Sequence, residues 1–131
     1  IDLDGFKTVN DTHGHEAGDH VLKVVAARLG SAMRESDTAA RIGGDEFILI
    51  LGDIAHAEEV AGIATRLLAE VARPIPYENQ ELRVGCSIGI ALYPDHAADA
   101  TALRKAADGA MYAVKRAGKC GFQLASNHVQ G

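Results

Sequence analysis

Two adjacent glycines, Gly43 and Gly44, separate two short segments with the composition of β-strands, and this pattern limits the possible folds more than any other. Residues 38–42 precede the glycines and residues 47–51 follow them. Paired glycines take the positive φ that a two-residue turn requires, so the sequence predicts a tight hairpin. Because residues 47–51 are apolar throughout, we expect a central strand covered on both faces.

The remaining segments alternate between strand and helix patterns. Residues 1–3 predict a short strand, and residues 6–14 predict a short helix. Apolar residues then recur at helical spacing, at Val21, Leu22, Val25, Leu29 and Met33. Further helices are predicted over 57–71 and 100–116, and further strands over 82–92 and 122–124, with Pro74 and Pro76 ending the first of these helices. This alternation indicates one α/β or α+β domain with a mixed sheet.

Composition excludes several classes of protein. The 131 residues are 47% hydrophobic and 24% charged, which is typical of a globular domain and not of a disordered chain. No apolar run approaches the ~18 residues of a membrane span. The net charge of −5 argues against duplex nucleic acid as a partner and suits a site for divalent cations. Two isolated cysteines, Cys86 and Cys120, predict no disulfide framework, so we expect a reducing, cytoplasmic environment.

Acidic residues stand at the ends of two predicted strands. Asp45 and Glu46 follow the glycine pair, and Asp2 and Asp4 bracket the end of the first strand. If the hairpin and the first strand are neighbours in the sheet, Asp2 and Asp45 converge, and converging carboxylates suit Mg²⁺. Two such ions support in-line attack on a phosphate. The alternative is a solvated turn, since Gly-Gly-Asp is also a common hairpin connector.

The segment after the first strand has features of a nucleotide site. A glycine turn at Gly5 before a helix aims backbone N–H groups outward, as phosphate binding requires, and Lys7 adds a positive charge. Asn10 and Asp19 offer the amide and carboxylate that the edge of a guanine would take, with helix capping as the alternative role. The chain has no P-loop motif, so a phosphate would depend on metal, backbone amides and scattered lysines.

Together these segments closely resemble the GGDEF family of diguanylate cyclases. The matching motifs cover nearly the whole chain in order: DLDGFK, ND, GH, GD, GGDEF, SIGIA and DGAMYAVKRAGK. The resemblance implies a central mixed, largely antiparallel sheet flanked by helices, palm-like as in nucleotidyl cyclases. It also implies the condensation of two GTP molecules into cyclic di-GMP with release of pyrophosphate.

The resemblance also implies roles for individual residues. The implied ligands of Mg²⁺ or Mn²⁺ are Asp2, Asp45, Glu46 and the Leu3 carbonyl, and the three acids form the implied catalytic group. Glu46 is the family's candidate for assisting deprotonation of the 3′-hydroxyl or for holding the second metal ion. The residues implied to bind GTP are Asn10 and Asp19 for guanine, and Gly5, Phe6, Lys7, Lys115 and Lys119 for the triphosphate. Since each subunit holds one GTP, catalysis requires a homodimer.

Arg34 and Asp37 match the family's RxxD inhibitory site for cyclic di-GMP. The alternative is an i,i+3 salt bridge at a helix end. Two positions depart from the family pattern near the implied phosphate site. Lys119 replaces an arginine, which keeps the charge but loses the planar fork, and Cys120 replaces an asparagine.

The chain starts at Ile1, without Met, signal peptide or basic leader, and without the helix and loop that precede the family's first strand. We therefore expect residues 1–131 to be a catalytic domain from a larger bacterial signalling protein, with an upstream sensory or receiver domain. The sequence leaves open whether the parent protein is membrane-anchored. One alternative function is a non-catalytic module that binds GTP or cyclic di-GMP. Another is an adenylyl-cyclase-like enzyme, which Asn10 and Asp19 disfavour because they should reject adenine.

Overall fold

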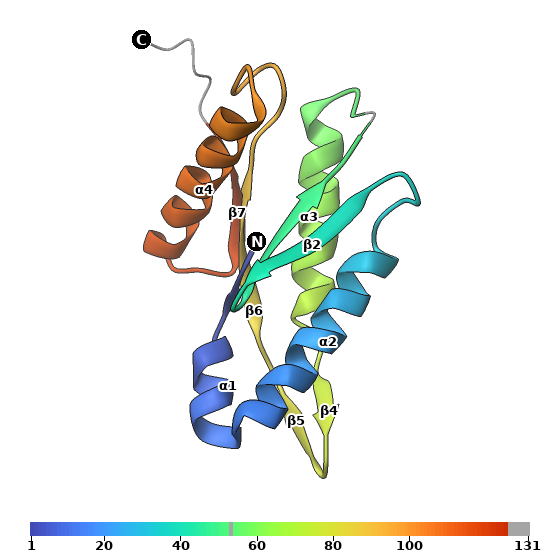
Figure 1. Ribbon diagram of the computed structural model, residues 1–131, viewed down its shortest axis with the longest axis vertical. Helices are drawn as coiled ribbons and strands as arrows, with labels where there is room; N and C mark the ends of the chain where they lie inside the picture. Colours follow the sequence, from blue (N-terminus) through green and yellow to red (C-terminus); the bar gives the residue numbers. More distant parts are fainter. Residues whose placement is uncertain (53, 126–131) are drawn as a thin grey trace.

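The computed structural model describes residues 1–52 and 54–125 of the chain. In chain order the elements are β1 (Asp2–Asp4), α1 (Phe6–His13), α2 (His15–Ser31), β2 (Thr38–Gly43), β3 (Glu46–Ile50), α3 (Ala57–Val71), β4 (Ile75–Tyr77), β5 (Gln80–Leu82), β6 (Gly85–Ile90), α4 (Ala100–Arg116) and β7 (Gly121–Leu124). Five strands form one sheet in the order β2-β3-β1-β6-β7, and β4 and β5 form a separate hairpin (Figure 1). Only β6 and β7 pair in parallel within the large sheet, so the implied mixed, largely antiparallel sheet is confirmed.

Alternation of side chains along the strands gives the sheet two faces. Leu3, Phe47 and Ile88 belong to the main core cluster, together with apolar residues of α2 and α3. Gly89 faces the other side, where a Cβ would come within 1.9 Å of the Ala107 carbonyl oxygen in α4. The missing side chain therefore lets α4 lie directly on β6. In Figure 1, α4 stands to the left of β1 and β6, and α2 and α3 stand to their right.

The hairpin at the glycine pair forms, but its turn is shifted by one residue from the prediction. Gly43 is the last residue of β2 and pairs with Glu46, which leaves Gly44 and Asp45 as the turn. Gly44 has a φ of 47°, a left-handed value that favours glycine. Arg41 Nη1 donates a hydrogen bond of 2.7 Å to the Gly44 carbonyl oxygen and so braces the turn. Asp45 therefore stands on the turn itself.

β3 is an interior strand, as predicted, but it is less covered than its apolar sequence suggests. Phe47 is 2% exposed, whereas Ile50 is 64% exposed. The neighbouring strand β1 has only three residues, and its register with β3 contains a single pair, Asp2 with Glu46. Beyond that pair, a cavity of about 820 Å³ lies between β3, β6, α3 and α4. The expectation of full cover on both faces is therefore wrong for the end of β3.

The strand predicted over residues 82–92 is two strands in two different sheets. β5 ends at Leu82 and pairs with β4, whereas β6 begins at Gly85 and lies in the large sheet. Pro76 lies within β4. Glu78, with a φ of 54°, and Asn79 join the two short strands. In residues 1–52 and 54–125, no helix is both long and apolar enough to span a bilayer.

Candidate active site

Asp2, Asp45 and Glu46 lie at one end of the sheet because β1 and β3 are hydrogen-bonded neighbours. The Leu3 amide donates to the Asp45 carbonyl oxygen at 3.0 Å, and Asp2 stands opposite Glu46 in the register. Residues directly opposite each other share one face of a sheet. The first strand and the hairpin are therefore neighbours in the sheet, which is the arrangement that the predicted convergence of Asp2 and Asp45 requires.

These carboxylates act on one another electrostatically. Partial burial and the charge of Asp45, with a smaller effect of Glu46, raise the pKa of Asp2 despite the nearby Lys115. Lys115 Nζ lies 3.5 Å from Asp2 Oδ2. Three carboxylates against one ammonium leave an excess of negative charge, and hard oxygen donors of this kind suit a divalent cation. In the part of the chain that the structure describes, no three His, Cys, Asp or Glu side chains are grouped closely enough to hold a metal ion.

Asp4, which the family resemblance does not place in the site, is the most heavily hydrogen-bonded acid in this region. Ser87 Oγ lies 3.0 and 2.9 Å from its two oxygens, Lys115 Nζ donates at 3.1 Å and the Cys120 amide donates at 3.0 Å. Burial alone would raise the pKa of Asp4, but these donors outweigh burial and lower it. The sequence signal for Asp4 is its spacing of two from Asp2, which places both on one face of a strand.

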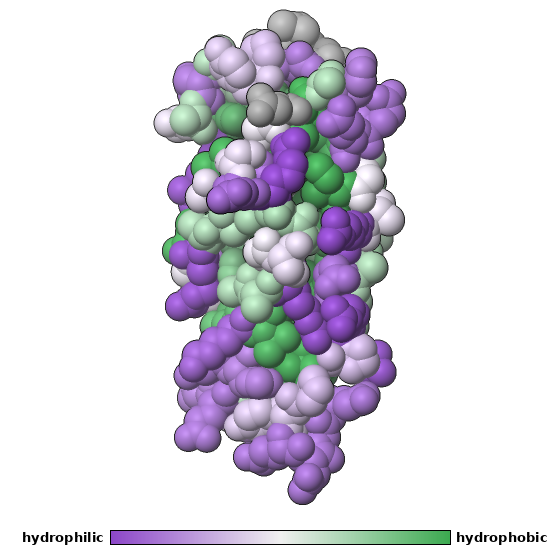
Figure 2. Space-filling model, turned by 90° about the vertical axis from the view of Figure 1, so that its right-hand side faces the viewer, coloured by the Kyte–Doolittle hydropathy of each residue, from purple (hydrophilic) through white to green (hydrophobic). Residues whose placement is uncertain are grey.

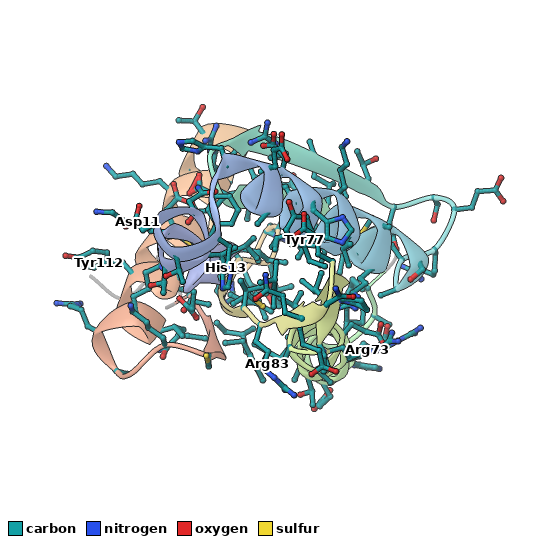
Figure 3. All side chains as sticks on the ribbon, turned by 90° about the horizontal axis from the view of Figure 1, so that it is seen from below. Asp11, His13, Arg73, Tyr77, Arg83 and Tyr112 are labelled. Carbon is teal, nitrogen blue, oxygen red and sulfur yellow. The ribbon has the colours of Figure 1, made fainter. Side chains whose placement is uncertain are left out.

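Lys115 is the basic residue of the α4 end that reaches the acids. Burial would lower its pKa, but the hydrogen bond that it donates to Asp4 and the charges of Asp2 and Asp4 raise the pKa, so the ammonium form is favoured. Arg116 instead lies over the ring of Tyr112, with Cζ 5.1 Å from the ring centroid. Tyr112 is 61% exposed and points away from the sheet on the outer side of α4 (Figure 3). Lys119 lies in the exposed loop after α4 with a φ of 67°.

Asn10 and Asp19 come close together because α1 and α2 turn back on each other at Gly14. A Cβ on Gly18 would lie 1.8 Å from Asn10 Oδ1, so the Asn10 side chain rests on the α2 backbone next to Asp19. Asp19 borders a cavity of about 360 Å³ between α2 and β2, whose other lining residues are Leu22, Lys23, Ala26, Leu29, Ala39, Ala40, Arg41 and Phe47. Asn10 is not among the lining residues.

The cavity walls are mainly apolar, which suits the flat face of a base. The side of the molecule that carries α2 shows apolar surface in its middle, bordered by polar residues (Figure 2). Asp19 supplies a carboxylate at the cavity, and Lys23 and Arg41 supply cations. Of the two residues implied to bind guanine, Asp19 therefore lines this cavity, whereas Asn10 lies against the backbone of Gly18.

The glycine turn before α1 has the form that the sequence predicts. Gly5 has a φ of 85° and precedes the first turn of α1, which has no side-chain cap in the described structure. Phe6 packs against the core, and Lys7 is exposed on that first turn. The first amides of the helix therefore face outward without a side-chain acceptor, beside one lysine.

Arg34 and Asp37 form the i,i+3 salt bridge that the sequence allowed as an alternative, with Nε 3.3 Å from Oδ2. The pair is also tied to the segment after β3: the Gly52 amide donates to Asp37 Oδ1 at 3.2 Å, and Arg34 Nη2 donates to the Gly52 carbonyl oxygen. Loss of hydration would raise the pKa of Asp37, but the hydrogen bonds from Arg34 and Gly52 outweigh this effect and lower it. The pair thus joins the two ends of the β2–β3 hairpin.

Comparison with known proteins defines the family of the chain. Residues 1–120 match the family model described as "Diguanylate cyclase, GGDEF domain". The chain belongs to this family. It is 43% identical over 126 residues to the diguanylate cyclase TpbB of Pseudomonas aeruginosa, covering 95% of this chain and 29% of TpbB. It is 42% identical over 122 residues to the bifunctional diguanylate cyclase/cyclic di-GMP phosphodiesterase MucR of the same species, covering 93% of this chain and 18% of MucR.

Solved structures of the family share this fold. The GGDEF domain of TpbB superposes with a TM-score of 0.92 at 42% identity, covering 95% of this chain and 73% of that chain. The GGDEF domain of DgcB from Caulobacter crescentus, solved in complex with c-di-GMP, gives a TM-score of 0.84 at 33% identity, covering 94% of this chain and 73% of that chain. This chain spans less than a third of the length of TpbB and of MucR.

Proposed function

We propose that this chain is the catalytic domain of a diguanylate cyclase, which condenses two GTP molecules into cyclic di-GMP and releases two pyrophosphates. The observation that carries the proposal is the adjacency of Asp2 on β1 to Asp45 and Glu46 at the β2–β3 hairpin. Adjacent carboxylates at a sheet end suit phosphoryl transfer, which depends on positioning and charge stabilisation more than on covalent chemistry of the protein. Membership of the GGDEF family supports the same conclusion.

The side chains at this end of the sheet are oxygen donors of the kind that a divalent cation, Mg²⁺ or Mn²⁺, prefers. Asp2, Asp45, Glu46 and the Leu3 carbonyl would hold two such ions in each site. When bound, such ions neutralise phosphate charge and favour ionisation of a hydroxyl. Glu46 would assist removal of the proton from the attacking 3′-hydroxyl.

The remaining site residues would bind GTP. Asp19 would accept hydrogen bonds from guanine N1 and N2, and the Asn10 amide beside it would complete recognition of the base edge. The triphosphate would be held by the backbone of Gly5 and Phe6 and by the lysines Lys7, Lys115 and Lys119. The apolar walls of the 360 Å³ cavity between α2 and β2 would hold the base.

The reaction requires two copies of the domain. Each chain would hold one GTP, and each 3′-hydroxyl must approach the α-phosphorus of the other nucleotide in line. We therefore infer a homodimer with the two sites facing each other. We also infer that the domain works in the cytoplasm, under an upstream sensory or receiver domain of a larger protein.

We further infer that cyclic di-GMP inhibits the enzyme through Arg34 and Asp37. The Arg34 side chain is 50% exposed, and its guanidinium can fork onto a guanine edge or a phosphate once it leaves Asp37. The c-di-GMP complex of the DgcB GGDEF domain supports a role for this ligand in the family. The second candidate function, a non-catalytic module for GTP or cyclic di-GMP, draws on the same Arg34–Asp37 pair.

Incubation of the purified protein with GTP and Mg²⁺ separates the two functions. We expect cyclic di-GMP and pyrophosphate to appear together, and chromatography of the nucleotides measures both. Binding of GTP or cyclic di-GMP without any product would favour the non-catalytic module. Equal use of ATP would contradict the roles given to Asn10 and Asp19.

A further inference from the structure

Asp4 is one of three polar residues that are buried in the described part of the chain, with 7% of its surface exposed. An ionised carboxylate is costly to bury unless charged and hydrogen-bonding partners compensate it. Its partners come from three parts of the fold: Ser87 on β6, Lys115 on α4 and Cys120 in the loop after α4. Both oxygens of Asp4 are therefore engaged, which distinguishes it from Asp2, whose Oδ2 lies 3.5 Å from the ammonium of Lys115.

The hydrogen bond to Asp4 fixes the Lys115 side chain, whose four carbons otherwise allow many rotamers. Its Nζ lies 3.1 Å from Asp4 Oδ1 and 3.5 Å from Asp2 Oδ2, and the side chain is only 25% exposed. Asp4 and Lys115 are 111 residues apart in the sequence, so only the packing of α4 against the sheet brings them together. The ammonium is held directly beside the proposed metal ligand Asp2.

The hydrogen bond between the Cys120 amide and Asp4 fixes the loop that carries Lys119. Gly118, Lys119 and Cys120 have φ values of 122°, 67° and 52°, a left-handed run that is unfavourable for the two non-glycine residues. The Cys120 amide donates to Asp4 Oδ2 at 3.0 Å, and this bond anchors the run to β1. Gly85 leaves room for the loop, because a Cβ there would lie 2.6 Å from Cys120 Sγ.

We propose that Asp4 is a positioning residue for the triphosphate: it holds Lys115 and the Lys119 loop in place without touching substrate or metal. The inference rests on the proposed function, which assigns both lysines to the phosphates. Asp2 cannot provide this restraint alone, because its carboxylate is also a proposed metal ligand. Asp4 keeps its partners whether or not Asp2 is engaged by a cation.

A double-mutant cycle on Asp4 and Lys115 tests this role through binding of the α,β-methylene analogue of GTP in the presence of Mg²⁺. Asp4→Asn keeps the size of the side chain and one oxygen that can accept from the Cys120 amide, so the Lys119 loop stays anchored, but it removes the charge that holds the ammonium. We expect Asp4→Asn and Lys115→Met each to weaken binding by about tenfold, and the double variant to bind within about twofold of Lys115→Met. Asp99→Asn, at the N-cap of the same helix, is the matched control and should bind like the wild type.

Effects of Asp4→Asn and Lys115→Met that multiply in the double variant would overturn the proposal, because Asp4 would then act independently of Lys115. Unchanged binding by Asp4→Asn would also overturn it. If Asp4→Asn does not fold, Ser87→Ala takes its place in the cycle. Ser87→Ala should weaken binding of the analogue by less, and it should cause no further weakening when Lys115→Met is also present. A wild type that binds the analogue but forms no cyclic di-GMP contradicts the proposed function and leaves this inference in force; a wild type that does not bind the analogue contradicts both.

Discussion

The side chain of Asn10 rests on the backbone of Gly18, with Oδ1 only 1.8 Å from the point where a Cβ would stand. The colliding atoms are the end of a flexible side chain, so Gly18→Ala should displace the Asn10 amide while the helices stay packed. We expect GTP affinity to fall by about tenfold and selectivity for GTP over ATP to fall with it, as measured by competition binding. Thermal stability should stay within about 1 kcal/mol of wild type, because alanine is the better helix former.

Gly62→Ala is the matched control for this prediction. Gly62 lies within α3, and a Cβ there meets no atom within 4 Å. This variant should gain up to about 1 kcal/mol of stability and bind GTP unchanged. A Gly18→Ala protein with wild-type base selectivity would contradict the placement of Asn10 at the base.

Asp45→Ala should abolish formation of cyclic di-GMP, with a fall of at least about a hundredfold, while the fold is retained. The reason is that Asp45 lies on a turn at the surface and not in the core, so its loss removes a proposed metal ligand without opening a cavity. Product chromatography and circular dichroism measure the two effects. Glu59→Ala, an exposed acid on α3, controls for loss of one negative charge; activity retained by Asp45→Ala would contradict the proposed metal site.

Arg34→Ala should leave the initial rate unchanged and relieve inhibition by added cyclic di-GMP. The substitution also removes the ion pair with Asp37, whose side chain is only 3% exposed, so a loss of thermal stability should accompany the effect. Inhibition curves with added product measure the effect. Arg73→Ala breaks the equivalent i,i+3 pair with Glu70 (3.0 Å) and is the matched control, because its inhibition curve should stay that of the wild type. Inhibition that is unchanged in Arg34→Ala would remove the regulatory assignment.

The Asp37 carboxylate should stabilise the fold only where it is ionised. Its pKa is lowered in the folded chain by hydrogen bonds from Arg34 and Gly52 that outweigh its desolvation. The stabilisation is therefore present above the unfolded pKa, near 3.9, and is lost as the pH falls through the folded value. Urea unfolding of wild type and Asp37→Asn should show a difference at pH 7 that shrinks toward pH 3. A difference that grows at low pH would contradict this sign.

The two cysteines should differ sharply in reactivity. Burial raises the pKa of Cys86 to about 12, so its thiol stays protonated and enclosed, whereas Cys120 is exposed. Titration with Ellman's reagent should detect one thiol in the native protein and two in denaturant. Cys120→Ser should remove the native reaction, and a Cys86 that reacts at the native rate of Cys120 would show that the core is open.

Local patterns in the sequence were sufficient for the individual elements. The sequence pattern predicted α4 over the same residues that the structure gives, 100–116. The glycine pair predicted the β2–β3 hairpin with an error of one residue, because φ preferences alone do not reveal the bulge between Arg41 and Gly43. The run over residues 82–92 predicted one strand where there are two, because an apolar pattern does not show where a strand changes sheet.

The family and the identities of the acids, amide and lysines follow from the sequence by itself, because motif order and side-chain chemistry are properties of the chain. Packing alone decided which of these residues meet. The antiparallel pairing of β1 with β3 placed Asp2 opposite Glu46, and the close packing of α4 against Gly89 brought Lys115 to Asp4. Contacts between residues so distant in the chain depend on strand register and helix approach, which no local pattern encodes.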